Sequence, residues 1–224
     1  MPALIRVGHR GAPAVAADNT LASFDAAVAI GVDMIEFDVL PGRTRPGELF
    51  VAHDYGALTR HPPLTLQAAL AHFATARFDG VRLQVDIKRR GHEQAVVAAL
   101  DEAGLRERAF ISTAARGVLG RFREIAPDLA LGWTVPDLPL VNELPAVGGL
   151  YRRGMPDRAA ARIAAGEVDA LVAHWSLVTE ALVAAVKGAG GEIYVWTVDD
   201  GAMLARLAAL GVTGVISNDP RLFG

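Results

Sequence analysis

Three carboxylates stand near the ends of two short apolar segments that are typical of β-strands. Glu36 and Asp38 lie two residues apart in DMIEFDV, and Asp86 lies in RLQVDI. Because successive side chains of a strand point to opposite faces, Glu36 and Asp38 share one face. Carboxylate oxygens are hard ligands that suit Mg²⁺ or Ca²⁺ rather than Zn²⁺. The three residues are therefore a candidate metal site, and pairing of the acids with arginines is the alternative.

Two histidines, His9 and His53, directly follow other predicted strands. Cleavage of a phosphodiester needs one group that takes a proton and another that gives a proton to the leaving alkoxide, and two histidines beside a cation can do both. Arg10 and Lys88 could hold phosphate oxygens or pair with the acids instead. Two unrelated hydrogen-bonded histidines in loops are the alternative to a catalytic pair.

The elements that must position these residues alternate between short apolar runs and alanine-rich stretches of helix length. Strands are predicted at 4–8, 33–39, 49–52, 82–87, 109–113, 130–134, 168–173, 192–197 and 213–217. Helices are predicted at 19–30, 64–77, 92–103, 115–126, 178–189 and 200–210. The stretch 136–166 is rich in proline and glycine, which predicts a loop with a short helix at about 157–165,.

The spacing of the strands indicates how they are arranged. Only about nine residues, rich in Gly and Pro, join 33–39 to 49–52. A parallel crossover needs a dozen or more, so this pair should be an antiparallel hairpin. The other eight strands predict a (β/α)8 TIM barrel with a small hairpin insertion after the second strand, forming one domain over 1–224. In such a barrel the residues at the strand ends meet at one mouth, where active sites lie.

The composition is that of a globular protein and excludes several classes. Of the 224 residues 52% are hydrophobic and 21% charged, and none is cysteine. This excludes disulfides, thiolate metal sites and a cysteine nucleophile. The 22 basic and 25 acidic residues leave a net charge of −3, without the basic excess of a nucleic-acid-binding module,. No signal-peptide-like or membrane-spanning apolar run is found, so a cytoplasmic location is expected, and no oligomeric state is indicated.

A series of motifs in order spans nearly the whole chain. The segment GHRGAPAVAADNTLASFDAAVAIGVDMIEFDV is followed by FVAHD, then by VDIK at 85–88, FIST at 110–113, YVWTVDD at 194–200 and GVISNDP at 214–220. In these motifs the chain resembles the glycerophosphodiester phosphodiesterase family. The resemblance implies a TIM barrel, a divalent cation, Mg²⁺ or Ca²⁺, and hydrolysis of a small glycerophosphodiester to glycerol 3-phosphate and an alcohol.

The resemblance also implies roles for individual residues. It implies a catalytic pair, His9 and His53, and three metal ligands, Glu36, Asp38 and Asp86. Arg10 and Lys88 match cations that contact phosphate, and Trp196 matches an aromatic residue that walls the substrate site. Asn19 begins the first predicted helix, where it is either a substrate-binding residue or a helix cap.

Three departures from the family pattern bear on the reaction. Asp86 stands where the family commonly has Glu in a Glu-x-Lys motif, and Asp-x-Lys resembles the related sphingomyelinase D/phospholipase D toxins. A lyase-like cleavage that releases a cyclic phosphate is therefore one alternative, and a barrel that binds phosphorylated ligands without turnover is another. The chain after His53 and Asp54 is shorter than usual, which predicts a more open site. Ala17-Asp18-Asn19-Thr20 replaces the family's Pro-Glu-Asn-Thr.

Overall fold

The computed structural model describes residues 4–43, 47–59, 62–115, 117–135 and 145–224. The strands are β1 (Ile5–His9), β2 (Met34–Pro41), β3 (Leu49–Val51), β4 (Arg82–Ile87), β5 (Ala109–Thr113), β6 (Ala130–Thr134), β7 (Ala170–His174), β8 (Glu192–Trp196) and β9 (Gly214–Ser217). The helices are α1 (Leu21–Ile30), α2 (Leu66–Phe73), α3 (Glu93–Glu102), α4 (Val118–Ile125), α6 (Pro145–Ala164), α7 (Glu180–Gly188) and α8 (Gly201–Ala209). Short 3₁₀ turns lie at Ala57–Thr59, Ala76–Phe78, Arg106–Arg108, Trp175–Leu177 and Pro220–Phe223.

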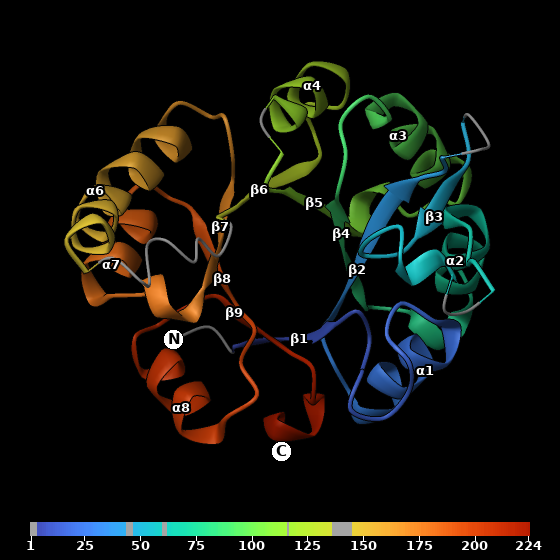
Figure 1. Cartoon of the computed structure of the whole chain (residues 1–224), viewed down its shortest axis with the longest axis horizontal. Coiled ribbons are helices and arrows are strands. Elements are labelled where there is room, and N and C mark those ends of the chain that lie inside the picture. The colour runs from blue at the N-terminus through green and yellow to red at the C-terminus, as the bar shows by residue number, and fades with distance from the viewer. Residues whose placement is uncertain (1–3, 44–46, 60–61, 116, 136–144) are drawn as a thin grey trace.

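The strands form a closed parallel barrel surrounded by the helices (Figure 1). The sheet order is β1-β9-β8-β7-β6-β5-β4-β2-β3, and the additional pairing of β1 with β2 closes it. β3 stays outside the barrel and pairs antiparallel with β2. The predicted (β/α)8 barrel with a hairpin insertion after the second strand is confirmed, and residues 44–46 of the hairpin connection lie outside the described residues.

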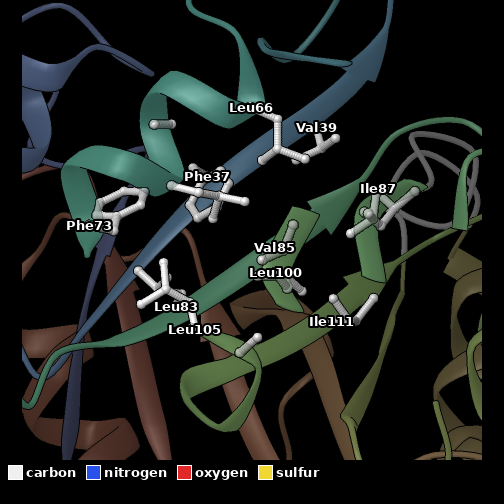
Figure 2. Packing of buried hydrophobic residues seen from close by; sticks show 14 of the residues in the cluster. Phe37, Val39, Leu66, Phe73, Leu83, Val85, Ile87, Leu100, Leu105 and Ile111 are labelled. Atoms are coloured by element: carbon white, nitrogen blue, oxygen red, sulfur yellow. The ribbon is translucent and has the colours of Figure 1, made fainter. Parts of the chain in front are cut away.

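The side chains of β2 and β4 alternate between the helices and the barrel interior. Phe37 and Val39 point toward α2 with Leu66 and Phe73, as Figure 2 shows, and the rings of Phe37 and Phe73 are 5.2 Å apart. Glu36 and Asp38 alternate with these two residues along β2 and are therefore turned inward,. This apolar packing between the sheet and α2 fixes the strand that carries two of the predicted metal ligands.

Replacement of Phe73 by alanine is expected to lower the free energy of unfolding by about 3–5 kcal/mol, because it leaves a cavity in this core. Phe73 is fully buried and its ring packs against those of Phe24, Phe37 and Phe78. Urea unfolding followed by circular dichroism measures the loss. Val15→Ala, at an exposed position, is the control and should change stability by less than about 0.5 kcal/mol,. A loss below about 1 kcal/mol for Phe73→Ala would contradict this account of the core.

Several helices begin at side-chain caps. Thr20 Oγ1 accepts a hydrogen bond from Ser23 N before α1, and Thr179 Oγ1 accepts one from Leu182 N before α7. Capping satisfies backbone N–H groups that have no partner within the helix. α1 ends at Gly31, whose φ of 94° is in the left-handed region that glycine adopts most easily,.

The sequence-based interpretation of 136–166 is wrong for 145–156, which was predicted to be loop, whereas the short helix predicted at about 157–165 is found as the second part of a longer helix. α6 runs from Pro145 to Ala164, although Pro156 lies inside it, and residues 136–144 lie outside the described residues. Proline and glycine weaken a helix locally, but packing of an apolar face can outweigh this preference. Met155 and Ala159 supply that face, since both are buried in the core beneath α6 and α7.

In the part of the chain that the structure describes, no helix is both long and apolar enough to cross a bilayer. α6 has the length for it, at 20 residues, but it contains four arginines,. The cytoplasmic location stays a prediction.

Candidate active site

A pocket of about 100 Å³ lies at the carboxyl ends of the barrel strands. It is lined by His9, Arg10, Glu36, His53, Gln84, Asp86, Lys88, Thr134, Val172, Trp196 and Ile216. The barrel thus brings seven of the nine predicted site residues to one pocket. The other two, Asp38 and Asn19, lie behind this lining: Asn19 is hydrogen-bonded to Asp38, and Asp38 pairs with Lys88.

Three buried carboxylates form a cluster beside this pocket. One oxygen from each of Glu36, Asp38 and Asp86 lies within 4.8 Å of the others. The parallel register sets Asp38 opposite Asp86, and Ser112 Oγ donates a 2.8 Å hydrogen bond to Asp86 Oδ1. Burial, with the charges of Asp38 and Asp86, raises the pKa of Glu36 well above its usual range,. A cation would relieve this repulsion, so a buried set of hard oxygen donors fits a divalent metal ion.

Two basic side chains are paired with the same acids. Lys88 Nζ lies 2.6 Å from Asp38 Oδ1 and 2.5 Å from Asp86 Oδ2, and Arg10 Nε lies 3.0 Å from Asp38 Oδ2. Burial alone would raise the pKa of Asp38, but Lys88 and Arg10 hold it below its usual value,. Both basic residues also line the pocket, so they can meet an anionic ligand there.

Asn19 does not cap α1, because Thr20 fills that position. Its side chain instead donates to Asp38 Oδ2 over 2.8 Å and accepts from Asp38 N over 3.2 Å. Arg10 and Asn19 both have left-handed backbone, with φ of 53° and 56°. Such conformations cost about 1–3 kcal/mol each and are concentrated at functional sites. Here the turn at Arg10 also directs its N–H to Glu36 Oε2 at 2.8 Å.

The two histidines have different surroundings. The ring of His9 has Nε2 at 3.9 Å from Glu36 Oε2 and Nδ1 at 2.7 Å from Asn218 Oδ1. Burial and the charge of Arg10 lower the pKa of His9 to about 4,. The side chain of His53 is 44% exposed, and its Nδ1 lies 3.3 Å from Asp54 Oδ2. His9 is therefore a buried neutral ring, whereas His53 stands at the solvent side of the pocket.

The depressed pKa of His9 predicts a pH dependence of stability. Between pH 6.5 and about 4 the unfolded chain binds a proton at His9 that the folded chain does not, so this residue makes stability fall as the pH falls through that window,. The effect is on the order of 3 kcal/mol. Urea unfolding of the wild type and of His9→Gln at several pH values measures the effect. The free energy of unfolding of the wild type, relative to that of His9→Gln, should fall as the pH is lowered. A difference that is independent of pH would contradict a buried neutral His9.

The site contains several polar residues that were not predicted from the sequence. Ser112 and Thr134 both reach Asp86 Oδ1, at 2.8 Å and 3.3 Å, and Gln84 Nε2 donates to Ser112 Oγ at 3.1 Å. Gln84 precedes Asp86 by two residues, and this alternation is the signal that could have identified it. Gln84 Oε1 and Trp196 Nε1 are buried without a hydrogen-bond partner among the described residues, and both residues line the pocket.

Comparison with known proteins identifies the family. The model of the glycerophosphoryl diester phosphodiesterase family matches residues 9–77 and 80–222. The chain is 26% identical to the glycerophosphodiester phosphodiesterase of Caldanaerobacter subterraneus subsp. tengcongensis, over 96% of this chain and 93% of the relative. It is 25% identical to glycerophosphodiester phosphodiesterase GDPD4 of Arabidopsis thaliana, over 96% of this chain and 70% of that protein.

Solved structures share the fold. A glycerophosphodiester phosphodiesterase from Thermotoga maritima is similar with a TM-score of 0.74 and 20% identity, over 100% of this chain and 98% of the other. An Oleispira antarctica phosphodiesterase in complex with sn-glycerol-3-phosphate is similar with a TM-score of 0.73 and 22% identity, over 97% and 94%. Since the family model covers nearly the whole barrel, the chain belongs to the glycerophosphoryl diester phosphodiesterase family and is a phosphoric diester hydrolase.

Proposed function

We propose that this enzyme hydrolyses small glycerophosphodiesters to glycerol 3-phosphate and an alcohol, with Mg²⁺ or Ca²⁺ as cofactor. The observation that carries the proposal is one pocket lined by His9 and His53 against a buried cluster of three carboxylates. The complex of the Oleispira antarctica relative with sn-glycerol-3-phosphate supports the same product here. The activity that gives the family its name agrees with both.

The residues that would hold the cation are Glu36, Asp38 and Asp86. Their oxygens are close enough to share one ion, and the raised pKa of Glu36, caused by burial and the two neighbouring carboxylates, reflects a repulsion that an ion would remove,. When bound, a divalent cation supplies positive charge for the phosphate oxygens. Mg²⁺ and Ca²⁺ both fit this donor set.

The remaining residues would bind the phosphate and move protons. Lys88 and Arg10 offer fixed positive charge at the pocket wall for the phosphate oxygens,. One histidine takes a proton from the attacking water, and the other gives a proton to the oxygen of the leaving alcohol as its bond to phosphorus breaks. Asn19 holds Asp38 from behind and is best described as a positioning residue.

Two unpartnered groups support a ligand that carries hydroxyls. In the described residues Gln84 Oε1 lacks a donor and Trp196 Nε1 lacks an acceptor. The two residues come from β4 and β8, which lie on opposite sides of the barrel in the strand order. Buried polar atoms are normally satisfied. A glycerol moiety, with hydroxyls that both donate and accept, would satisfy them.

A lyase-like reaction is the second candidate. In it a neighbouring hydroxyl of the substrate, in place of water, attacks phosphorus and a cyclic phosphate is released. The observation that favours it is Asp86 itself, which stands where the family commonly has Glu. Its carboxylate is one methylene shorter and is held by Ser112 and Thr134. Binding of phosphorylated ligands without turnover is disfavoured, because a binding protein has no need of two proton-transfer groups.

Phosphorus NMR of one reaction mixture tests these proposals. Glycerophosphocholine, glycerophosphoethanolamine, bis-glycerophosphate and lysophosphatidylcholine are incubated with enzyme and Mg²⁺ or Ca²⁺, with a chelator as control. A cation-dependent signal of glycerol 3-phosphate is expected, and the substrate peak that shrinks names the alcohol. A cyclic phosphate signal would establish the lyase-like reaction instead. If no peak changes but a diester binds tightly, the protein binds phosphorylated ligands without turnover.

A further inference from the structure

A chain of hydrogen bonds leads from the loop after β8 to the ring of His9. His9 Nδ1 lies 2.7 Å from Asn218 Oδ1, and Asn218 Nδ2 donates to Asp199 Oδ2 over 2.6 Å. Asp199 follows β8, Asn218 follows β9 and His9 ends β1. These three strands are neighbours in the barrel. Closure of the barrel therefore joins residues that are 209 positions apart in sequence.

The chemistry of these groups decides where each hydrogen lies. A carboxylate only accepts hydrogen bonds, whereas a side-chain amide has one donating end and one accepting end. Asn218 must turn its NH₂ toward Asp199, since the reverse orientation would bring two acceptor oxygens to 2.6 Å. Its carbonyl oxygen then faces His9, so Nδ1 carries the hydrogen of the 2.7 Å contact. In a neutral ring protonated at Nδ1, the lone pair is on Nε2.

Asp199 is itself held in place by the turn after β9. Its Oδ1 accepts from Asn218 N over 2.7 Å and from Ser217 Oγ over 3.0 Å. The adjacent carboxylate has a separate task, because Asp200 caps α8 by accepting from Met203 N over 2.8 Å. The pair Asp199 and Asp200 thus provides a test residue and a matched control on the same loop.

We infer that Asp199 and Asn218 are positioning residues that hold His9 with its proton on Nδ1 and its lone pair on Nε2. Nε2 is the nitrogen on the Glu36 side, at 3.9 Å from Glu36 Oε2. With its lone pair on Nε2, His9 would enter the reaction as the proton acceptor and His53 as the proton donor. This assignment of roles rests on the proposed function. The partner of His9 is a neutral amide and that of His53 is the carboxylate of Asp54, so the two histidines are not equivalent.

Nitrogen-15 NMR of the histidine rings in the intact 224-residue chain tests the tautomer directly, without substrate. The signals of His9 are identified by their loss in His9→Gln. The wild type is expected to show a protonated Nδ1 and an unprotonated Nε2. Asn218→Leu and Asp199→Ala should give a mixture of tautomers, while Asp200→Asn, which keeps a capping side chain, should not. A hydrogen on Nε2 in the wild type, or an unchanged Nδ1–H ring in both variants, would overturn the inference.

Steady-state kinetics, with the diester that the phosphorus NMR experiment identifies as substrate, tests the consequence. Asn218→Leu and Asp199→Ala are each expected to lower kcat by about 100-fold, with KM changed by less than about threefold, because proton transfer is affected more than binding. Asp199→Asn keeps an oxygen that can accept from Asn218 and should lose less than Asp199→Ala. The double variant should be no worse than the worse single variant, since both act through one ring. An equal loss in Asp200→Asn would mean that any disturbance of the loop suffices and would overturn the inference.

The two measurements separate this inference from the proposed function. If the wild type shows the Nδ1–H tautomer but cleaves no diester, the positioning of His9 by Asn218 and Asp199 stands and the proposed activity is refuted. If the wild type cleaves diesters while His9 carries its hydrogen on Nε2, the positioning is refuted and the proposed activity stands.

Discussion

Replacement of His9 or His53 by alanine is expected to lower kcat by about 10³-fold in each case. Both side chains line the pocket beside the acidic cluster, and loss of a general acid or base typically costs 10²- to 10⁴-fold in rate. The measurement is steady-state hydrolysis of the best diester at saturating substrate and cation. KM should change much less than kcat, because neither ring is needed to hold the phosphate when Lys88 and Arg10 remain.

A matched control for these variants is His72→Ala. His72 lies on α2, away from the pocket, where it pairs with Asp25 over 3.0 Å. Its replacement should leave kcat within about twofold, since the hydrogen bond to Asp25 and the ring contact with Phe78 that it removes involve none of the pocket residues,. The double variant of His9 and His53 should lose less than the product of the two single losses, because groups that act as a unit are not additive. Losses below about tenfold in both single variants would eliminate the paired-histidine mechanism.

Neutralisation of the acidic cluster is expected to abolish cation binding and, with it, turnover. Glu36→Gln and Asp86→Asn each remove one of the three carboxylates proposed to hold the cation. Loss of a ligand charge weakens binding of a hard cation. We expect affinity for Mg²⁺ or Ca²⁺, measured by calorimetry, to fall at least about tenfold and kcat at least about 100-fold. Removal of the cation from the wild type by a chelator should have the same effect on activity, and addition of cation should reverse it.

The free energy of unfolding in the absence of a cation is a second readout for these variants. It should not fall, although cation affinity and turnover do. Burial and the neighbouring acids raise the pKa of Glu36, which shows that its charged form is disfavoured in the folded chain,. Glu36→Gln should therefore keep or increase the free energy of unfolding in chelator while it loses cation binding. Glu124→Gln, at an exposed position on α4, serves as the control for both readouts. Retained cation affinity in both Glu36→Gln and Asp86→Asn would refute the metal site.

The barrel, and the set of residues that meet at its mouth, could be predicted from the amino-acid sequence. Periodicity alone set Glu36 and Asp38 on one face of a strand, since the two-residue repeat of a strand leaves no other choice. The short connection between β2 and β3 required a hairpin, because too few residues were present for a parallel crossover. These features depend on local chain geometry, which can be read without knowing what the chain packs against.

The contacts that join distant segments could not be predicted from the sequence, because they depend on how the whole chain packs. Asn218 meets His9 because closure of the barrel sets β9 beside β1, and no local pattern encodes that distance. Asn19 holds Asp38 while Thr20 caps α1, although both residue types suit either task,. α6 forms through a stretch with Pro156 because the core stabilises it. In each case the free energy comes from burial and from satisfying polar groups across the fold, and this depends on neighbours that the local sequence does not contain.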